Sequence, residues 1–368
     1  MTMSRRSKAW WKRRGAALRR ALLLSAAAAA MAALALGAFA GRLMAQSSPA
    51  AKAAFAAQGD EIILLGTHGG PGLTQERSEP ATLLVVDGTS YLIDCGIGTM
   101  RRLLDAGVPS QTIGTIFITH NHPDHALGLV DVMANDFLSV DFGPPGGSRT
   151  FNIYGPPQTP AVVSAAYDFI RIPYSIFAAE HLGASTLADP FRAHVVDGGG
   201  LVYQDDKIRV TAAENTHYQL MPAKDRARMK SFAYRFQTRY GVIVFTGDTG
   251  PSAAVEKLAT GADVLISEVE ELGAPTGAPR TTPNAAALAA HLRLEHLPVK
   301  DLGEMASKAR VKAVLMHHFV GAGSGQKFVE GVKKYYSGTV FAGADLQRYC
   351  LGTPDGNGGT VRTLAPCN

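Results

Sequence analysis

The chain has 368 residues, and its 36 Lys+Arg and 31 Asp+Glu are unevenly distributed. Nine of the basic residues and none of the acidic ones lie in the first 45 positions, so the rest of the chain carries 27 basic against 31 acidic residues. The basic balance therefore belongs to the first segment, and composition gives no support for a general electrostatic grip on nucleic acid by the remainder.

The first 45 residues have the pattern of a targeting segment. A basic start precedes an uncharged, alanine-rich stretch over Ala21–Ala40, and Ala38-Phe39-Ala40 has the small-x-small form of a cleavage site. The pair Arg19-Arg20 partly matches a twin-arginine signal. We expect a cleaved signal peptide over 1–45, with an uncleaved inner-membrane anchor as the alternative, then a linker over 46–58. The domain over 59–368 would then be periplasmic or secreted.

Apolar β-branched runs alternate with amphipathic stretches after the linker. The runs predict strands over Ile62–Leu65, Thr82–Asp87, Tyr91–Asp94, Thr115–Thr119, Asn152–Tyr154, Ile208–Ala212, Phe232–Thr238, Val242–Phe245, Val264–Ser267, Val311–Met316, Thr339–Phe341 and Gln347–Leu351. The amphipathic stretches predict helices over Thr99–Ala106, Ala126–Asn135, Ala161–Phe169, Ala253–Thr260, Val299–Arg310 and Lys327–Tyr336. Asp87-Gly88 and Arg239-Tyr240-Gly241 predict hairpin turns. This mixture indicates an α/β (α+β) fold in which helices cover sheets.

The segment His120-Asn-His-Pro-Asp-His125 places four metal-binding side chains within six residues, directly after a predicted strand. His120 and His122, two residues apart, suit one ion, and Asp124 and His125 suit a second ion beside it. Imidazole and carboxylate ligands together favour zinc, with manganese and iron as alternatives.

Two metal ions need further ligands, and the ends of predicted strands provide them. His217 follows Ile208–Ala212, Asp248 follows Val242–Phe245, and the adjacent His317 and His318 follow Val311–Met316. The glycine-rich segment 65–71 matches no nucleotide-binding motif, and we expect a turn there that brings backbone close to the metal pocket.

The three cysteines have different expected roles. Cys95 lies in an apolar run and is predicted to be buried. Cys350 and Cys367 are a candidate disulfide that would hold the C-terminal tail in an oxidising compartment.

The order of Asp94, the His120–His125 motif, His217, Asp248 and His318 resembles the metallo-β-lactamase fold superfamily from about Ile62 to Leu351. The segments Leu65-Gly-Thr-His-Gly-Gly, Phe117-Ile-Thr-His-Asn-His-Pro-Asp-His and Phe245-Thr-Gly-Asp-Thr are most similar to its ribonuclease Z and arylsulfatase-like branch. The resemblance implies a four-layer αβ/βα sandwich with two Zn²⁺ ions at one edge, between the sheets.

The resemblance also implies a role for each candidate residue. His120, His122 and His217 would hold the first zinc, and Asp124, His125 and His318 the second, with Asp248 bridging both. Asp94 would orient the ligand loop through hydrogen bonds. Asp124, Asp248 and His296 are the candidate catalytic residues. His296 is included because it is similar to a histidine proposed to protonate the leaving group; an ordinary surface histidine is the alternative. Tyr234 is a candidate substrate contact or a core residue, and we expect structural roles for His68, His181, His194 and His291.

The implied reaction is hydrolysis by a metal-bridging hydroxide. His217 and Asp248 are only 31 positions apart, which leaves no room between them for a tRNA-gripping arm. We therefore expect an exported hydrolase of small phosphodiesters or sulfate esters, with a small-molecule ester substrate, no general nucleic-acid binding, and membrane contact only through the N-terminal segment. The alternatives are a ribonuclease Z-like tRNA 3′ endonuclease, a lactonase or other ester or thioester hydrolase, and a di-iron redox protein.

Overall fold

A computed structural model describes residues 59–70, 72, 74–142, 150–180, 189–270, 284–320, 325–354, 360–361 and 363–367. The predicted leader over 1–45 and the predicted linker over 46–58 lie outside these residues, as does His181, so those assignments stay predictions. Among the described residues, no helix combines the length and apolar character needed to cross a membrane.

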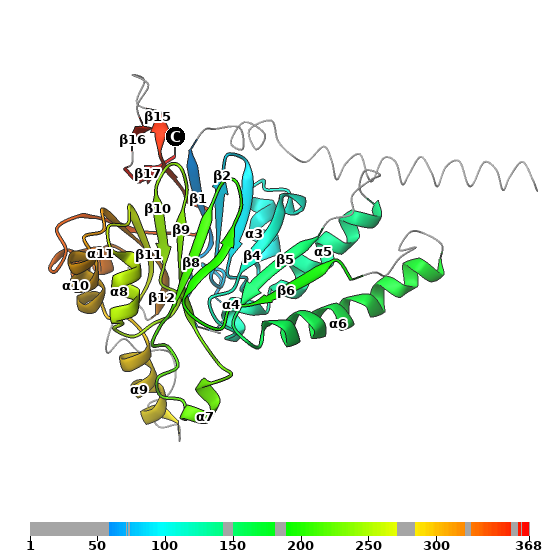
Figure 1. The fold of residues 1–368 in the computed structure, drawn as a ribbon, viewed down its shortest axis with the longest axis horizontal. Helices are drawn as coiled ribbons and strands as arrows, with labels where there is room; N and C mark the ends of the chain where they lie inside the picture. The colour runs from blue at the N-terminus through cyan, green and yellow to red at the C-terminus, as the bar shows by residue number, and fades with distance from the viewer. Residues whose placement is uncertain are drawn as a thin grey trace, which may run out of the picture. The chain divides into compact units, whose positions relative to one another are not determined.

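Two β-sheets form the centre of the described domain (Figure 1). The first sheet has eight strands in the order β17-β14-β1-β2-β3-β4-β5-β6. Its members are β1 (Asp60–Gly66), β2 (Ala81–Val86), β3 (Thr89–Ile93), β4 (Ile113–Phe117), β5 (Phe151–Gly155), β6 (Phe191–Val195), β14 (Arg348–Leu351) and β17 (Ala365–Pro366). The strands from β3 to β6 run parallel to one another, whereas β1, β2 and β3 pair antiparallel.

The second sheet has seven strands in the order β13-β12-β11-β10-β9-β8-β7. They are β7 (Gly200–Gln204), β8 (Arg209–Glu214), β9 (Phe232–Gln237), β10 (Val242–Phe245), β11 (Val264–Glu270), β12 (Ala313–Val320) and β13 (Thr339–Ala342). The strands β10 to β13 are parallel, and β7, β8, β9 and β10 pair antiparallel. A separate two-stranded ribbon joins β15 (Thr353–Pro354) to β16 (Thr360–Val361).

Helices pack against the outer faces of both sheets, which makes four layers. The helical elements are α3 (Thr99–Asp105), the 3₁₀ turn Ser110–Thr112, α4 (Pro123–Ala126), α5 (Leu129–Phe142), α6 (Thr159–Ala179), α7 (Ala223–Arg226), α8 (Ala253–Ala259), α9 (Ala285–Glu295), α10 (Val299–Ala309) and α11 (Gly325–Lys333). One core lies under α3, α5 and α6, and another under α8, α10 and α11. The predicted α/β sandwich is therefore confirmed.

The core between the sheets is rich in aromatic side chains. The Phe117 ring packs edge-on against Phe236 at a centroid distance of 5.2 Å, and Tyr234 lies beside it at 5.8 Å. Tyr234 is fully buried, and its hydroxyl donates to the Ile118 carbonyl at 2.9 Å. Core packing, rather than substrate contact, is the role that this geometry gives to Tyr234. Because both faces of β1 are covered, Ile62–Leu65 is apolar at every position.

The predicted strands and helices are present, but several elements were missed or had other bounds. β6 and β7 carry polar and exposed residues at one edge of each sheet, so they lack an apolar run. α9 is alanine-rich with no clear apolar face, and α6 continues past Phe169 through Pro173. The predicted helix over Ala126–Asn135 is divided between α4 and α5, and β12 extends through His317 and His318 to Val320.

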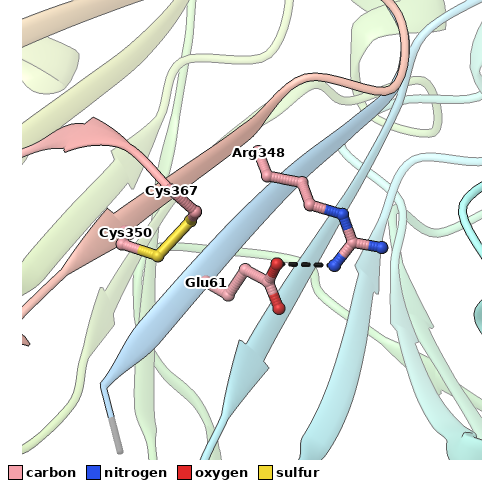
Figure 2. The surroundings of a disulfide bond; sticks show 4 residues. All are labelled: Glu61, Arg348, Cys350 and Cys367. Atoms are coloured by element: carbon pink, nitrogen blue, oxygen red, sulfur yellow. Dashed lines mark hydrogen bonds and ion pairs between the residues drawn. A yellow bond between two sulfur atoms is a disulfide. The ribbon is translucent and has the colours of Figure 1, made fainter. Parts of the chain in front are cut away.

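The C-terminal tail is attached to the first sheet by a disulfide. Cys350 and Cys367 are bonded with their Cα atoms 5.2 Å apart, beside an ion pair between Arg348 and Glu61 (Figure 2). β17 pairs with β14, and Leu364 is buried in the core between the sheets. The structure thus contains the predicted Cys350–Cys367 pair, and Cys95 is buried and free as expected.

Candidate metal centre

The seven candidate ligands come from four separate stretches of chain and meet where strands of both sheets end. His120 and His122 follow β4, Asp124 and His125 lie in α4, His217 follows β8, Asp248 follows β10, and His318 lies in β12. Six of the seven side chains are buried, and His122 is partly exposed. The chain therefore brings together every ligand that the sequence indicated.

Three histidines form the first group. The Nδ1 atom of His122 lies 3.1 Å from Nε2 of His120 and 3.0 Å from Nε2 of His217. Nitrogens that bind one zinc ion tetrahedrally at about 2.0–2.1 Å lie roughly 3.3 Å apart, so this spacing suits three donors around a single ion.

The second group consists of Asp124, His125 and His318, with Asp248 between the groups. Oδ2 of Asp124 lies 3.6 Å from Nε2 of His125 and 3.5 Å from Nε2 of His318. Asp248 lies 3.1 Å from Nε2 of His318 and 3.4 Å from Nε2 of His125. The same carboxylate approaches Nε2 of His120 at 3.8 Å and that of His217 at 3.9 Å, so it reaches both groups.

The second ring nitrogen of several candidate ligands is held by a neighbour. Nδ1 of His120 lies 3.0 Å from the Thr119 hydroxyl, and Nδ1 of His217 donates to the Glu295 carbonyl at 2.9 Å. Nδ1 of His125 donates to Asp94 at 2.9 Å. Such partners orient the ring and leave Nε2 as the free donor atom, which is the usual arrangement for histidines that bind metal.

Asp94 links β3 to the ligand loop. Its carboxylate accepts hydrogen bonds from the backbone and hydroxyl of Thr119 as well as from His125. Its backbone has a φ of 57°, which costs an ordinary L-residue about 1 kcal/mol or more, and the surrounding contacts hold it there. Asp94 therefore contacts the ligand-bearing segment in the way the sequence predicted.

The two groups have opposite electrostatic character. Burial lowers the pKa of His120 and of His217 well below its ordinary value and that of His122 to about 4, so these rings are neutral and can donate electron pairs. Burial also opposes a charge on His318, yet Asp248 and Asp124 raise its pKa to about 10. The second group thus strongly favours a cation.

The donors in this centre fit a divalent metal. Nε2 of His125, Oδ1 of Asp248 and Nε2 of His318 are buried and have no hydrogen-bond partner among the described residues. Each such orphan costs about 1–3 kcal/mol unless something else satisfies it. Nitrogen and carboxylate ligands converging in two groups suit zinc first, so the clusters are divalent-metal binding sites.

A glycine turn closes one side of the centre. The Gly70 backbone N–H donates to Oδ2 of Asp124 at 3.0 Å. At Gly69, a Cβ atom would lie 2.8 Å from Nδ1 of His318, so only glycine fits. The described part of this segment, residues 65–70, thus brings backbone to the metal pocket as predicted.

Three residues beside the centre were missed in the sequence. Glu268, in β11, accepts a hydrogen bond from Nδ1 of His296 and another from the Thr249 backbone at 2.5 Å. His291 lies with its Nε2 atom 3.3 Å from Nε2 of His296, and its Nδ1 donates to Glu295 at 2.6 Å. His291, for which a structural role was expected, is thus brought by α9 to the edge of the candidate site. The i, i+4 spacing of His291 and Glu295 was the available signal.

The other histidines of the described part lie outside the two groups. His317 is buried, and burial lowers its pKa to about 3, but its side chain belongs to neither group. The backbone of His68 forms a β-bridge with Phe319. His194 stacks on Tyr154 at 4.3 Å and bonds to Asn152, as expected for a structural residue.

Comparisons with known proteins agree with this geometry. The family model for the beta-lactamase superfamily domain matches residues 89–319. Ribonuclease Z of Mycobacterium avium is 28% identical over 304 residues, which cover 80% of this chain and 99% of the relative. Ribonuclease Z of Mycobacterium marinum is 26% identical over 291 residues, covering 78% and 97%.

Solved structures show the same fold at low identity. The metallo-β-lactamase fold protein YhfI from Bacillus subtilis superposes with a TM-score of 0.57 at 16% identity, covering 80% of this chain and 99% of that protein. Human tRNase Z, short form, superposes with a TM-score of 0.53 at 21% identity, covering 78% and 98%.

These relatives contradict the expectation of a small-molecule ester substrate and no general nucleic-acid binding. The curated proteins that match along almost their whole length are ribonucleases by name. The expectation failed because net charge averages over a whole surface, whereas binding depends on the charges beside the site. The short spacing between His217 and Asp248 excludes a tRNA-binding insertion at that one place only.

Proposed function

Because the chain belongs to the metallo-β-lactamase superfamily and resembles its ribonuclease Z branch, we propose that it is a metal-dependent ribonuclease that hydrolyses phosphodiester bonds of RNA. The observation that carries this proposal is the convergence of seven metal-binding side chains in a chain that matches ribonuclease Z along 99% of the relative's length. A transfer RNA precursor is the substrate class that the human structural relative's name suggests. Sulfate-ester hydrolysis stays a prediction.

We assign the ligands in two sets. His120, His122 and His217 would hold one Zn²⁺, Asp124, His125 and His318 the other, and Asp248 would bridge them. Zinc ions bound here would lower the pKa of a water nucleophile and polarise the phosphoryl oxygens. Asp124 suits the role of a zinc ligand because its carboxylate is ionised. His125 and His318 outweigh the effect of burial and keep the pKa of Asp124 below the ordinary value.

We assign to His296 the role of giving a proton to the leaving oxygen. Burial alone would lower its pKa, but Glu268 raises the pKa above the ordinary value, so this carboxylate favours the protonated ring. Glu268 holds Nδ1, which leaves Nε2 as the atom that delivers the proton. The ring lies 5.0 Å from that of His217 and 6.0 Å from that of His318, beside both metal groups.

The test is cleavage of a transfer RNA precursor with a 3′ trailer by the zinc-reconstituted protein. We expect trailer release that EDTA stops and zinc restores, and we expect Asp248→Ala to lower kcat/KM by a hundredfold or more (about 3 kcal/mol). Asp206→Ala is the matched control, because Asp206 is exposed in the turn before β8, at the end of that strand away from His217. An intact substrate, or equal cleavage by the Asp248→Ala variant, would contradict the proposal.

A further inference from the structure

The segment between His217 and β9 carries a concentration of positive charge that the metal centre does not use. Residues 219–230 contain four basic side chains and one acidic side chain, in a domain that is otherwise slightly acidic. Three of the basic residues are exposed, namely Lys224, Arg226 and Arg228. We call these three residues the basic lip.

The segment that bears the basic lip starts at a metal ligand and is fixed to α9. His217 donates from Nδ1 to the Glu295 carbonyl, and the Leu220 N–H donates to the Glu295 carboxylate at 2.7 Å. The Gln219 side chain donates to the Leu294 carbonyl. The chain that leads to α7 therefore keeps a defined position beside α9 (Figure 1).

Successive turns give the rest of the segment a regular shape. The Met221 N–H donates to the Tyr218 carbonyl at 3.1 Å, and Pro222 accepts from Asp225 and Arg226. Lys230 closes the segment: its ammonium group donates to the Asp197 carbonyl at 2.6 Å and pairs with the Asp197 carboxylate at 3.0 Å. Lys230 thus has a structural role that sets it apart from the basic lip.

The charges of the basic lip are available to a ligand. Lys224 and Arg226 form no ion pair within the described part of the chain, and the Arg228 side chain is 74% exposed. Its only recorded ionic partner there is Asp225 at 3.8 Å, and an exposed pair at this distance contributes little. The fold does not need these three cations for its stability, and they lie next to the candidate metal centre. They therefore suit the binding of an anionic substrate.

We propose that the basic lip binds the phosphate backbone of RNA and holds the strand across the metal centre. The proposal rests on the ribonuclease function above and names the surface that its substrate occupies. α7 begins six positions after His217, a span of at most about 21 Å, so the basic lip contacts phosphates within roughly six nucleotides of the scissile bond. Long, exposed cationic side chains neutralise phosphates without reading bases, so binding depends on salt and little on sequence.

The test compares two triple variants of the zinc-loaded enzyme. The first replaces Lys224, Arg226 and Arg228 with Gln. The control replaces three exposed lysines with Gln: Lys308 of α10, Lys333 at the end of α11, and Lys334 directly after it. It removes the same charge on a helical layer of the second sheet. Binding of a fluorescein-labelled mature transfer RNA, which has no trailer to cleave, is measured by anisotropy between 50 and 500 mM KCl. Circular dichroism checks that both variants fold.

We expect the lip variant to bind at least tenfold more weakly at 150 mM KCl and the slope of log Kd against log salt to fall by about 2, since three phosphate contacts are lost. The control should match the wild type. Equal binding and an equal slope in the lip variant, or the same loss in the control, would overturn the inference. These results are separable from catalysis: lip-dependent binding without any trailer cleavage supports the basic lip and refutes the ribonuclease function, whereas cleavage by the wild type with lip-independent binding does the reverse.

Discussion

Gly69 lies where the backbone comes closest to the metal ligands. An added Cβ atom would be 2.8 Å from Nδ1 of His318 and equally close to Val320, and the strand β12 that carries both is buried. His318 already has a φ of 49°, which few side chains tolerate, so it has little freedom to move away. The position of His318 thus depends on Gly69, which is not itself a candidate metal ligand.

Gly69→Ala should therefore weaken metal binding. We expect about a tenfold loss of affinity for the second zinc, similar to the loss of a residue that orients a ligand. Competition with a zinc chelator measures the affinity. Gly114→Ala is the matched control, because its Cβ atom would have no heavy atom within 4 Å. Equal affinities of the two variants would contradict this account.

Asp60 makes stability depend on pH. Its side chain is 1% exposed, and burial raises its pKa to about 7 despite a hydrogen bond from Thr238. The unfolded carboxyl titrates near 3.9, so folding becomes less favourable as pH rises from about 4 to about 7, and the full cost of the buried charge remains above pH 7.

The Asp60→Asn variant removes that titration. We compare the free energy of unfolding of the variant with that of the wild type. The difference, variant minus wild type, should increase by about 2–3 kcal/mol between pH 5 and pH 8. Urea denaturation at several pH values in that interval measures the difference. A difference that stays constant with pH would show that the buried carboxyl does not titrate as described.

The candidate ligands were predictable because they cluster in sequence or follow apolar strands, as His120–His125 and Asp248 do. Glu268 was not predictable, since a single carboxylate within the buried strand β11 has no motif around it. His291 and Glu295 depend on α9, whose alanine-rich sequence hides its helical period. A residue on an unpredicted element cannot be placed near a site from sequence alone.

At the scale of elements, strands with two covered faces were the easiest to predict. β1, β10 and β11 are continuous apolar runs because helices and the opposite sheet cover them. The edge strands β6 and β7 have exposed positions such as Val195 and Leu201 and mix polar with apolar residues. Their strand conformation comes from pairing with neighbours, which the local sequence does not encode.

The disulfide should stabilise the attachment of the C-terminal tail. It closes a segment with a sequence separation of 17 residues and holds β17 against β14. For a loop of this length the entropic effect is about 3 kcal/mol, so Cys367→Ser should lower the free energy of unfolding by about that amount. Urea denaturation measures it.

Dithiothreitol provides the control for the disulfide. It should destabilise the wild type to the level of Cys367→Ser and leave that variant unchanged, because Cys95 is buried and unpaired. If the reductant leaves the wild type as stable as before, the bond does not contribute as expected.

At the scale of the whole molecule, charge is arranged by segment. The basic residues of positions 1–45 lie outside the described domain, and export of that domain stays a prediction that the disulfide supports, since such bonds persist in oxidising compartments. Within the domain, the basic lip makes one edge positively charged, although the net charge of the domain is slightly negative. The location of the domain would decide which RNA the proposed ribonuclease meets.

The central claim is that four distant stretches of chain build one centre for two metal ions. The most direct test is the metal content of the purified protein after reconstitution with zinc and removal of the excess, measured by plasma mass spectrometry against protein concentration. The account predicts two equivalents of zinc per chain in the wild type and a clear loss in the Asp248→Ala variant. Less than one equivalent of any transition metal in the reconstituted wild type would contradict it.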